Sequence, residues 1–328
     1  MNTPNINPQS LLETIGWTPL VEIDRSPDNV DIFAKLESFN PGGSVKDRIG
    51  KYILEQLLDQ GMIPPGGTVI EPTAGNTGIG MAIAAAKLDL EAIFVVPRGF
   101  STEKEDLMAA LGAEVVHVPN EAGMGGAAER AHELADEIED AVVPQQFANP
   151  LNVEAHERTT GKEVIEQLDG RIGALVVGIG SAGTLMGMAN AIRKAVSDLY
   201  VVAVEPGGST YGELFGKRRE PMPYKTEGIG THDPDVAELL DPAAIDDIIA
   251  IDDRRAQREL KRLGAEEGHL VASSSGAASA AAFDVATAIS NGEIDVPHST
   301  VVTVFPDGSE RYLSKGIYDE FDSWEGKG

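Results

Sequence analysis

The sequence of 328 residues contains no cysteine and has few aromatic residues, which make up 5% of the chain. Without cysteine the protein can form no disulfide, no thiolate metal site and no thiol nucleophile. Any sulfur chemistry must therefore use the sulfur of a substrate. A reducing compartment suits such a chain, and its N-terminal segment lacks the basic and apolar regions of a signal peptide. We therefore expect a cytoplasmic protein.

Positive charge is also scarce, because 26 lysines and arginines stand against 53 aspartates and glutamates, a formal net charge of −27. Such a chain repels nucleic acid phosphates and anionic lipids, so neither a nucleic acid nor a membrane is expected as a partner. The acidic residues are spread along the chain, which is typical of the solvated acidic surface of halophilic proteins. They indicate the solvent environment rather than the chemistry.

Long uncharged segments are limited to residues 172–192, which carry no charge and are long enough to span a membrane. The run contains glycine, serine, threonine and asparagine, which argues against a membrane helix. It divides better into a buried strand, a glycine loop and a helix of small residues. With 42% hydrophobic residues the chain can bury a sizeable core, and its length favours two lobes.

Apolar runs of strand length alternate with segments of helical period, which predicts an α/β fold with parallel sheets. Each run is almost continuously apolar, as in a sheet that is covered on both faces. The clearest predicted strands are residues 67–73, 91–97, 113–119, 174–180, 199–206, 269–275 and 299–306.

Three helices have clear signals. Residues 44–60 place four hydrophobic side chains on one face, and Gly61 follows as a stop. Thr102 and Glu105 form a potential capping box before the next helix. A third helix is predicted over residues 125–141, and residues 149–156 are expected to connect the two lobes.

The first loop that could carry chemistry is NPGGSVKDR, in which Ser44 can cap a helix and Lys46 falls in its first turn. A cation is unfavourable there because the helix N-terminus carries partial positive charge. Lys46 should therefore lose its proton more readily than a free lysine, as an amine that attacks a carbonyl must. The alternative interpretation is a solvated surface lysine beside Asp47 and Arg48.

The second loop, EPTAGNTGIGMA over residues 71–82, joins a strand to a helix through small and hydroxyl residues. Its backbone N–H groups and the helix dipole could bind an anion, including a carboxylate. An ordinary tight turn between a strand and a helix would have the same composition.

The third loop, GIGSAGTLMG over residues 178–187, also opens a helix and should hold a phosphate. The kind of ligand that carries this phosphate is open, because Gly178, Gly180 and Gly183 match the dinucleotide-binding pattern G-x-G-x-x-G. Glu205, 22 residues after Gly183, lies close to where a dinucleotide fold places its ribose-binding acid. An NAD-dependent oxidoreductase is therefore an alternative from this loop alone.

The fourth loop, ASSSGAA over residues 272–278, brings three hydroxyl groups to another turn, where a helix cap is the plainer interpretation. The sequence does not place any of these serines in G-x-S-x-G. It also lacks a Walker A pattern and H-E-x-x-H, and its six histidines are not spaced as metal ligands, so no metal site is predicted.

Taken together and in this order, the four loops resemble the pyridoxal-phosphate enzymes of the cysteine synthase and cystathionine β-synthase family. The resemblance extends over most of the chain, from IGWTPL through KTEGIG to PDGSERYLS. It implies fold type II, the two-lobed fold of the tryptophan synthase β subunit, in which each lobe is a mainly parallel sheet flanked by helices. Residues 40–150 would form a smaller, mobile lobe, and residues 1–39 with 151–328 the larger lobe. Family members are commonly homodimers.

The resemblance also implies roles for individual residues. Lys46 would form the internal aldimine with the cofactor, Asn76 would hydrogen-bond its ring oxygen, and Ser275 would meet its pyridine nitrogen. The residues expected at the cofactor phosphate are Gly180, Ser181, Ala182, Gly183 and Thr184. Those expected at the substrate are Thr73, Ala74, Gly75, Asn76, Thr77, Gln146 and Gly228.

The implied reaction is a β-replacement that forms L-cysteine from O-acetylserine, or another activated serine, and sulfide. The sequence departs from the usual family pattern at Trp17, at Ala74, where serine is common, and in GSAGT. Family members that make cystathionine also carry TAGNTG and KTEGIG, so reaction with homocysteine is an alternative. A non-catalytic binding module that keeps the fold is a third possibility, against which the retention of Lys46 argues.

Overall fold

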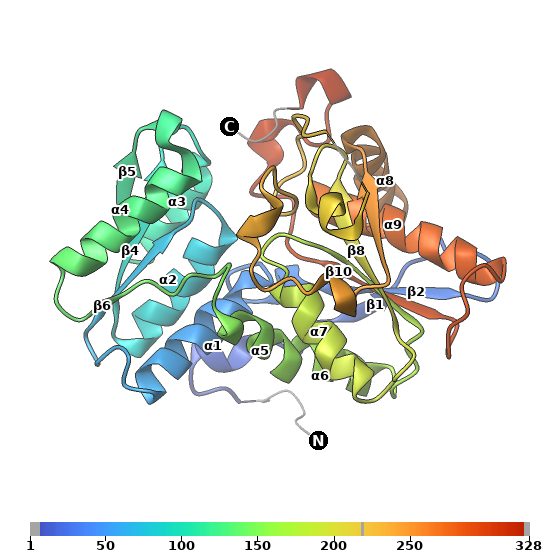
Figure 1. Ribbon diagram of the computed structural model, residues 1–328, viewed down its shortest axis with the longest axis horizontal. Helices are drawn as coiled ribbons and strands as arrows, with labels where there is room; N and C mark the ends of the chain where they lie inside the picture. Colours follow the sequence, from blue (N-terminus) through green and yellow to red (C-terminus); the bar gives the residue numbers. More distant parts are fainter. Residues whose placement is uncertain (1–6, 218–219, 325–328) are drawn as a thin grey trace.

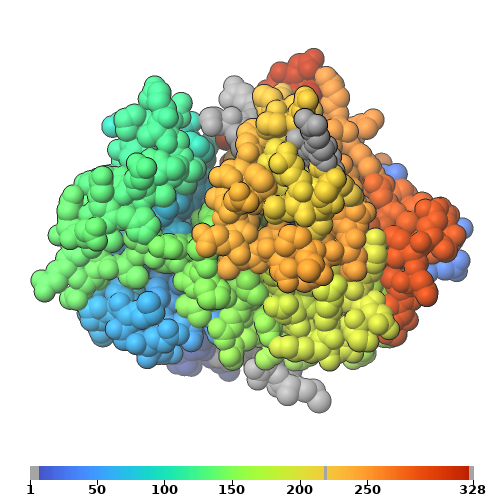
Figure 2. Space-filling view, in the orientation of Figure 1, coloured from blue at the N-terminus to red at the C-terminus, as the bar shows by residue number. Residues whose placement is uncertain are grey.

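The computed structural model describes residues 7–217 and 220–324, which form two αβα units, each built around its own sheet (Figure 1). Within the described residues the smaller sheet has four strands in the order β5-β4-β3-β6, and the larger has six in the order β1-β2-β10-β7-β8-β9. All strand pairs are parallel except β1 with β2. In Figure 2 the two units form separate masses, blue to green at left and yellow to red at right.

The smaller sheet is covered on both faces. Alternate side chains of its strands pack against α1, α2 and α3 on one face, and against α4 on the other. Its strands are β3 (Thr68–Pro72), β4 (Glu91–Pro97), β5 (Glu114–Val118) and β6 (Ala141–Val142). Its helices are α1 (Lys46–Asp59), α2 (Asn76–Leu88), α3 (Thr102–Ala110) and α4 (Gly123–Glu137).

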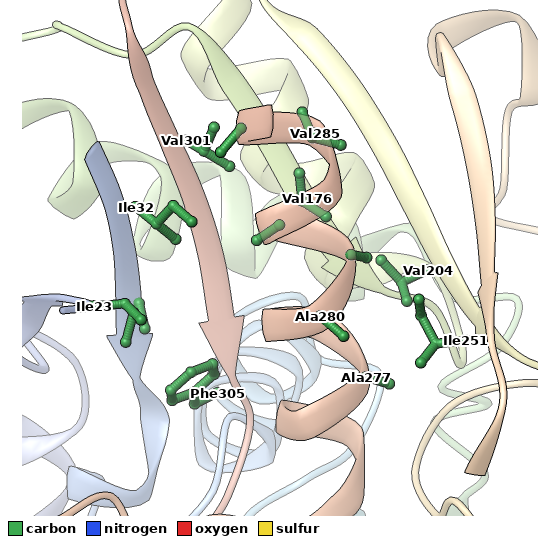
Figure 3. Close-up of a cluster of buried hydrophobic side chains, with 14 of the residues drawn as sticks. Ile23, Ile32, Val176, Val204, Ile251, Ala277, Ala280, Val285, Val301 and Phe305 are labelled. Carbon is green, nitrogen blue, oxygen red and sulfur yellow. The ribbon is translucent and has the colours of Figure 1, made fainter. Parts of the chain in front are cut away.

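The larger sheet also lies between two helical layers. Its strands are β1 (Leu20–Glu22), β2 (Asp31–Leu36), β7 (Ala174–Gly178), β8 (Tyr200–Pro206), β9 (Asp247–Ile251) and β10 (Thr300–Phe305). One face packs against α8 (Asp253–Glu267) and α9 (Ser273–Ser290), the other against α6 (Thr160–Gln167) and α7 (Gly183–Arg193). Figure 3 shows Val285 of α9 near Val176 and Val301 of the sheet, and Ala277 of the same helix near Ile251.

The structure confirms the predicted fold class and six of the seven predicted strands. The uncharged run also divides as expected, into β7, a glycine loop and α7. The strand predicted over residues 269–275 is wrong, because Val271 forms only an isolated bridge with Gly308 and the three serines begin α9. Among the described residues no helix is both long and apolar enough to cross a membrane.

Helix boundaries also differ from the predictions in places. Helix α1 ends as expected, with Gly61 at a φ of 67°. Ser101, rather than Thr102, caps α3 by accepting a hydrogen bond from the Lys104 backbone N–H. Helix α4 begins and ends earlier than residues 125–141.

The expected connection over residues 149–156 is instead part of helix α5 (Pro150–Arg158), capped by the Asn149 side chain. This helix packs against both α1 and α7, so it contacts both units. The strands of the smaller sheet all lie between residues 68 and 142, whereas the lobe boundaries at 40 and 150 and the mobility of the smaller lobe stay predictions.

Candidate active site

One pocket lies between the two units, where the first turns of α1, α2, α7 and α9 meet the loop after β10. It encloses about 640 Å³, including its open mouth. Three predicted site residues from different segments line it: Lys46, Asn76 and Gly228. The predicted phosphate loop contributes Gly180, Ser181, Ala182 and Thr184. The structure thus brings together predicted site residues up to 182 positions apart (46 and 228).

Lys46 is the first residue of α1, and the backbone around it is held on both sides. The Ser44 hydroxyl accepts a hydrogen bond from the Lys46 N–H at 3.2 Å, and the Val45 N–H donates to the Pro306 carbonyl at 2.8 Å. Ser44 also forms a β-bridge with Asp307. The larger unit therefore fixes the start of α1 from the loop after β10.

The Lys46 amine faces the pocket without a hydrogen bond or ion pair to any described residue. Burial lowers the pKa of Lys46 to about 8, because removal from water disfavours the ammonium form. The sequence predicted the direction of this shift but attributed it to the helix dipole, whereas desolvation is the cause here. A large fraction of this amine is neutral near pH 8, so it can act as a nucleophile or a base.

Helices α1 and α2 approach so closely that only glycine fits at their crossing. A Cβ atom on Gly50 would overlap the Gly80 backbone, and one on Gly80 would come within 2.5 Å of the Lys46 carbonyl oxygen. This contact places Lys46 beside the N-terminus of α2. The glycine pair therefore sets the distance between the two loops.

Asn76 opens α2, and its amide is held by two residues of the loop after β10. Its Oδ1 accepts a hydrogen bond from Arg311 Nη1 at 2.7 Å, and its Nδ2 donates to Asp307 Oδ2 at 2.7 Å. Arg311 also donates to the Gly42 carbonyl, and Tyr312 donates to Asp307 Oδ2 at 2.5 Å. Both polar ends of the Asn76 side chain are thus anchored to the larger unit.

The remaining predicted substrate residues lie just behind the pocket wall. Thr77 donates to Gln146 Oε1 at 2.7 Å, and the buried Glu71 accepts from the backbone N–H groups of Gln145 and Gln146 at 2.9 and 3.1 Å. Burial raises the pKa of Glu71 to about 7. Glu71 thereby fixes the loop that carries Gln146. The structure brings Thr73, Ala74 and Gly75 to the same turn, next to Asn76, without making them part of the pocket wall.

The N-terminus of α7 points at the pocket from the larger unit. Ala182 takes a left-handed conformation (φ 65°) and turns the chain from the glycine loop into the helix. The first N–H groups of a helix have no partner within it, and they favour an anion. A Cβ on Gly183 would overlap the Asn152 side chain, which in turn donates to Ser181 Oγ at 3.0 Å. This turn therefore has the geometry expected of an anion site.

His156 lies beneath this anion site and is fully buried. Its Nε2 lies 3.2 Å from the Thr184 hydroxyl oxygen, and its Nδ1 lies 2.9 Å from that of Thr160. Desolvation, with help from Arg48 and Lys46, holds the pKa of His156 well below its usual range. The imidazole is therefore neutral and orients the Thr184 hydroxyl without adding charge.

Ser275 is fully buried at the start of α9, and its Oγ has no hydrogen-bond partner among the described residues. Its neighbour Ser274, rather than Ser275 itself, lines the pocket. A buried hydroxyl without a partner is costly, and a ligand atom with a lone pair would satisfy it. The predicted position of a pyridine nitrogen is compatible with this hydroxyl.

Charged side chains also join the two units next to Gly228 and Tyr312 of the pocket wall. Lys104 of α3 lies 3.3 Å from Glu227, which also pairs with Lys315 at 2.7 Å. The Lys104 amine sits 4.3 Å from the centre of the Tyr312 ring, and the Ser314 hydroxyl donates to Glu103. These contacts connect α3 of the smaller unit to loops of the larger one.

A partnerless amine and an anion-favouring helix N-terminus in one pocket, with an orphaned serine hydroxyl next to a residue of its wall, fit a phosphorylated aromatic aldehyde. The family model described as "Pyridoxal-phosphate dependent enzyme" matches residues 11–307 of the chain. The chain therefore belongs to the pyridoxal-phosphate-dependent enzymes, and its fold is that of the cysteine synthase group within them. Pyridoxal phosphate is its cofactor.

Individual relatives resemble the chain along almost its whole length. An O-acetylserine-dependent cystathionine β-synthase of Bacillus subtilis is 44% identical over 311 residues, which cover 94% of this chain and 97% of that one. A cysteine synthase of Helicobacter pylori is 42% identical, covering 94% and 98%. The crystal structure of an O-acetylserine sulfhydrylase isoform from Entamoeba histolytica has a TM-score of 0.87 at 35% identity, covering 97% and 94%.

The family membership decides between the alternatives that the third loop left open. Glu205 is buried at the end of β8 and accepts a hydrogen bond from the Gly212 N–H, and it is not part of the pocket wall. The dinucleotide interpretation therefore has no acid at the site. A binding module without catalysis is likewise disfavoured, because the matched family consists of enzymes.

Sequence reasoning missed the residues that hold the site together, namely Asp307, Arg311, Tyr312, Asn152 and His156. Asp307, Arg311, Asn152 and His156 each contact a group at least 28 positions away in the chain, and Tyr312 supports Asp307. PDGSERYLS carries only a resemblance to the family, and residues 149–156 are predicted only as a connection between the lobes. No periodicity or spacing in either segment indicates a contact with the pocket. Polar residues clustered directly after a buried strand, as after β10, were the available signal.

Proposed function

We propose that the protein is a pyridoxal-phosphate-dependent β-replacement enzyme that forms L-cysteine from O-acetylserine and sulfide. The observation that carries this proposal is the Lys46 amine, which has no partner among the described residues and shares a pocket with the anion site at the start of α7. Relatives named cysteine synthase and O-acetylserine sulfhydrylase support the choice of substrate and product.

In this proposal the bound cofactor supplies an electron sink for the substrate α-carbon. Lys46 would hold the cofactor aldehyde, and its amine in the neutral form would serve as the general base for the α-proton of the substrate. Its lowered pKa supports that role. The residues from Gly180 to Thr184 hold the phosphate through backbone N–H groups and hydroxyls. Ser275 would meet the ring nitrogen as a neutral group, which would not force protonation there.

The substrate carboxylate is bound by the turn that begins α2, where residues 73–77 offer backbone N–H groups and hydroxyls beside the helix N-terminus. Gln146 completes this site, held in place by Thr77 and Glu71. Gly228, which also lines the pocket, would contact the substrate. Ala74 supplies no hydroxyl, so the leaving group is recognised by other contacts.

A second candidate is the formation of cystathionine with homocysteine as the acceptor. The Bacillus subtilis relative, and a Helicobacter pylori protein of known structure with 40% identity and a TM-score of 0.84, both bear the name O-acetylserine-dependent cystathionine β-synthase. The two candidates share the donor and the first half of the reaction. They differ only in the sulfur nucleophile that enters the pocket.

The deciding experiment offers O-acetylserine, O-phosphoserine and serine, each with sulfide and with homocysteine, and compares kcat/KM. We expect the highest value for O-acetylserine with sulfide. A higher value with homocysteine would select the second candidate, and a preference for O-phosphoserine or serine would replace the donor. Absence of turnover with all six pairs would contradict both candidates.

The oligomeric state, cellular location and surface of the enzyme are also part of this proposal. We expect a cytoplasmic homodimer with an acidic, halophilic surface, in which the smaller lobe moves to open and close the pocket. Light scattering after gel filtration measures the mass, for which the proposal predicts twice 34.7 kDa. Thermal unfolding at rising salt tests the acidic surface, since a net charge of −27 repels itself less when it is screened.

A further inference from the structure

The contacts of Asn76 determine which way its amide points. Arginine carries only donors, so Arg311 can bind only the oxygen end of that amide. The other end donates to Asp307 Oδ2, which also accepts the Tyr312 hydroxyl hydrogen. The amide is therefore locked with Oδ1 toward Arg311. One Nδ2 hydrogen is used by Asp307, and the second is left for a ligand in the pocket that Asn76 lines.

The same two residues also hold the loop in front of Lys46. Arg311 donates to the Gly42 carbonyl, and the Arg311 guanidinium lies 2.7 Å from where a Cβ on Gly43 would be. Asp307 bridges to Ser44 through the backbone. One short segment after β10 thus sets Asn76 relative to Lys46, although these two residues belong to different helices.

We propose that Asp307 and Arg311 are positioning residues that act through Asn76, holding its amide N–H toward the cofactor ring. The inference rests on the proposed function and adds to it two residues outside the four loops. Asp307 is 2% exposed, so neither water nor another conformer readily replaces its contact. Loss of either residue leaves the Asn76 amide free to rotate, which weakens the contact without removing the amide itself.

The test is a double-mutant cycle measured on apoprotein that is reconstituted with pyridoxal phosphate. We expect Asp307→Ala, Arg311→Ala and Asn76→Ala each to raise the Kd for the cofactor about tenfold, the size of one hydrogen bond between partly charged groups. In the Asn76→Ala background, Asp307→Ala and Arg311→Ala should add less than about twofold, because the residue through which they act is gone. The visible absorption band of the bound cofactor should shift in the same variants.

Two further variants separate positioning from general damage to the fold. Asp307→Asn keeps an oxygen acceptor for Asn76 and Tyr312, so its Kd should stay within about threefold of the wild type. Arg258→Ala removes an exposed arginine of α8 and serves as the matched control for lost charge. Effects that add up fully in the double variants, or an unchanged Kd in Asp307→Ala and Arg311→Ala, would overturn the inference. Wild-type protein that bound no pyridoxal phosphate would instead contradict the proposed function.

Discussion

The N-termini of α2 and α7 both follow a parallel strand and both reach the pocket, yet they present different chemical groups. The turn of α7 is built from Gly180, Ser181, Ala182 and Gly183, and offers mainly backbone N–H groups to an anion. The turn of α2 offers the Asn76 amide, whose direction is set by residues more than 230 positions away. A backbone site is preformed by local geometry, whereas a side-chain site needs partners from elsewhere in the fold.

The comparison predicts that an added methyl group weakens cofactor binding strongly in the turn of α7 and only slightly in the turn of α2. Gly183→Ala places a methyl group on the Asn152 side chain, whereas the Cβ of Gly75→Ala meets nothing within 4 Å. Overpacking typically costs about 1 to 3 kcal/mol. We therefore expect Gly183→Ala to raise the Kd for pyridoxal phosphate about 10- to 100-fold, and Gly75→Ala to leave it within about threefold. Equal Kd values for both variants, measured by reconstitution of apoprotein, would contradict the comparison.

The second residue of each helix is a threonine, which allows a matched pair of substitutions. Thr184 contacts His156 at the phosphate site, and Thr77 contacts Gln146 at the proposed carboxylate site. Thr184→Val should raise the cofactor Kd about tenfold, since a hydrogen bond to a charged group is lost. Thr77→Val should instead raise KM for O-acetylserine roughly fivefold, with the cofactor Kd unchanged. If Thr77→Val raised the cofactor Kd and Thr184→Val raised KM instead, the turn of α2 would bind the phosphate and the turn of α7 the carboxylate.

Only the turn of α2 depends on a carboxyl that titrates near neutral pH. The pKa of Glu71 is raised by burial from 4.5 to about 7, so the folded protein binds more protons than the unfolded chain between these values. Stability from this group therefore falls as pH rises from 4.5 to 7, by roughly 3 kcal/mol. Chemical denaturation at pH 5 and pH 8 should show that the wild type loses more free energy of unfolding than Glu71→Gln. An identical loss in both proteins would exclude Glu71 as the source.

The smallest expected effect concerns the contacts of Lys104 and Lys315 with Glu227, which link α3 to the larger unit. Lys104→Gln breaks the pair with Glu227, while Lys315 keeps its own contact with Glu227. We expect KM for O-acetylserine to rise about two- to fivefold and kcat to change little, because one charged hydrogen bond of several contacts between α3 and the larger unit is lost. Lys87→Gln, which removes an exposed lysine of α2, is the control. The same change in KM for both variants would show that the effect comes from the net charge and not from the contact between Lys104 and Glu227.

The parts of the fold that could be predicted are those encoded locally. Near-continuous apolar runs gave the central parallel strands, and the glycine pattern after β7 gave the loop that opens α7. The strand predicted over residues 269–275 failed because its short apolar stretch ends in three serines, which begin a buried helix rather than continue a ladder. Strands β1, β2, β6 and β9 were not predicted, since they are short or carry charged residues such as Lys35, whose amine pairs with Glu163 in the interior.

The candidate site likewise combines features that are encoded locally with contacts between distant segments. Lys46 and the loop of residues 180–184 were expected in one place, and the structure places them in one pocket. The contacts of Asp307 and Arg311 were not foreseeable, because nothing in their own segment indicates that the partner is the amide of Asn76. Burial of Lys46 was also not visible in the sequence. The sequence therefore indicated only the helix dipole as a cause of its lowered pKa, whereas the structure shows desolvation.

The central claim is that Lys46 is the amine that holds the cofactor. Borohydride reduction of protein reconstituted with pyridoxal phosphate, followed by peptide mapping, tests it directly. The account predicts that the cofactor is fixed to Lys46 and that Lys46→Ala takes up none covalently. A cofactor fixed to a different lysine, or none fixed to the wild-type protein, would contradict it.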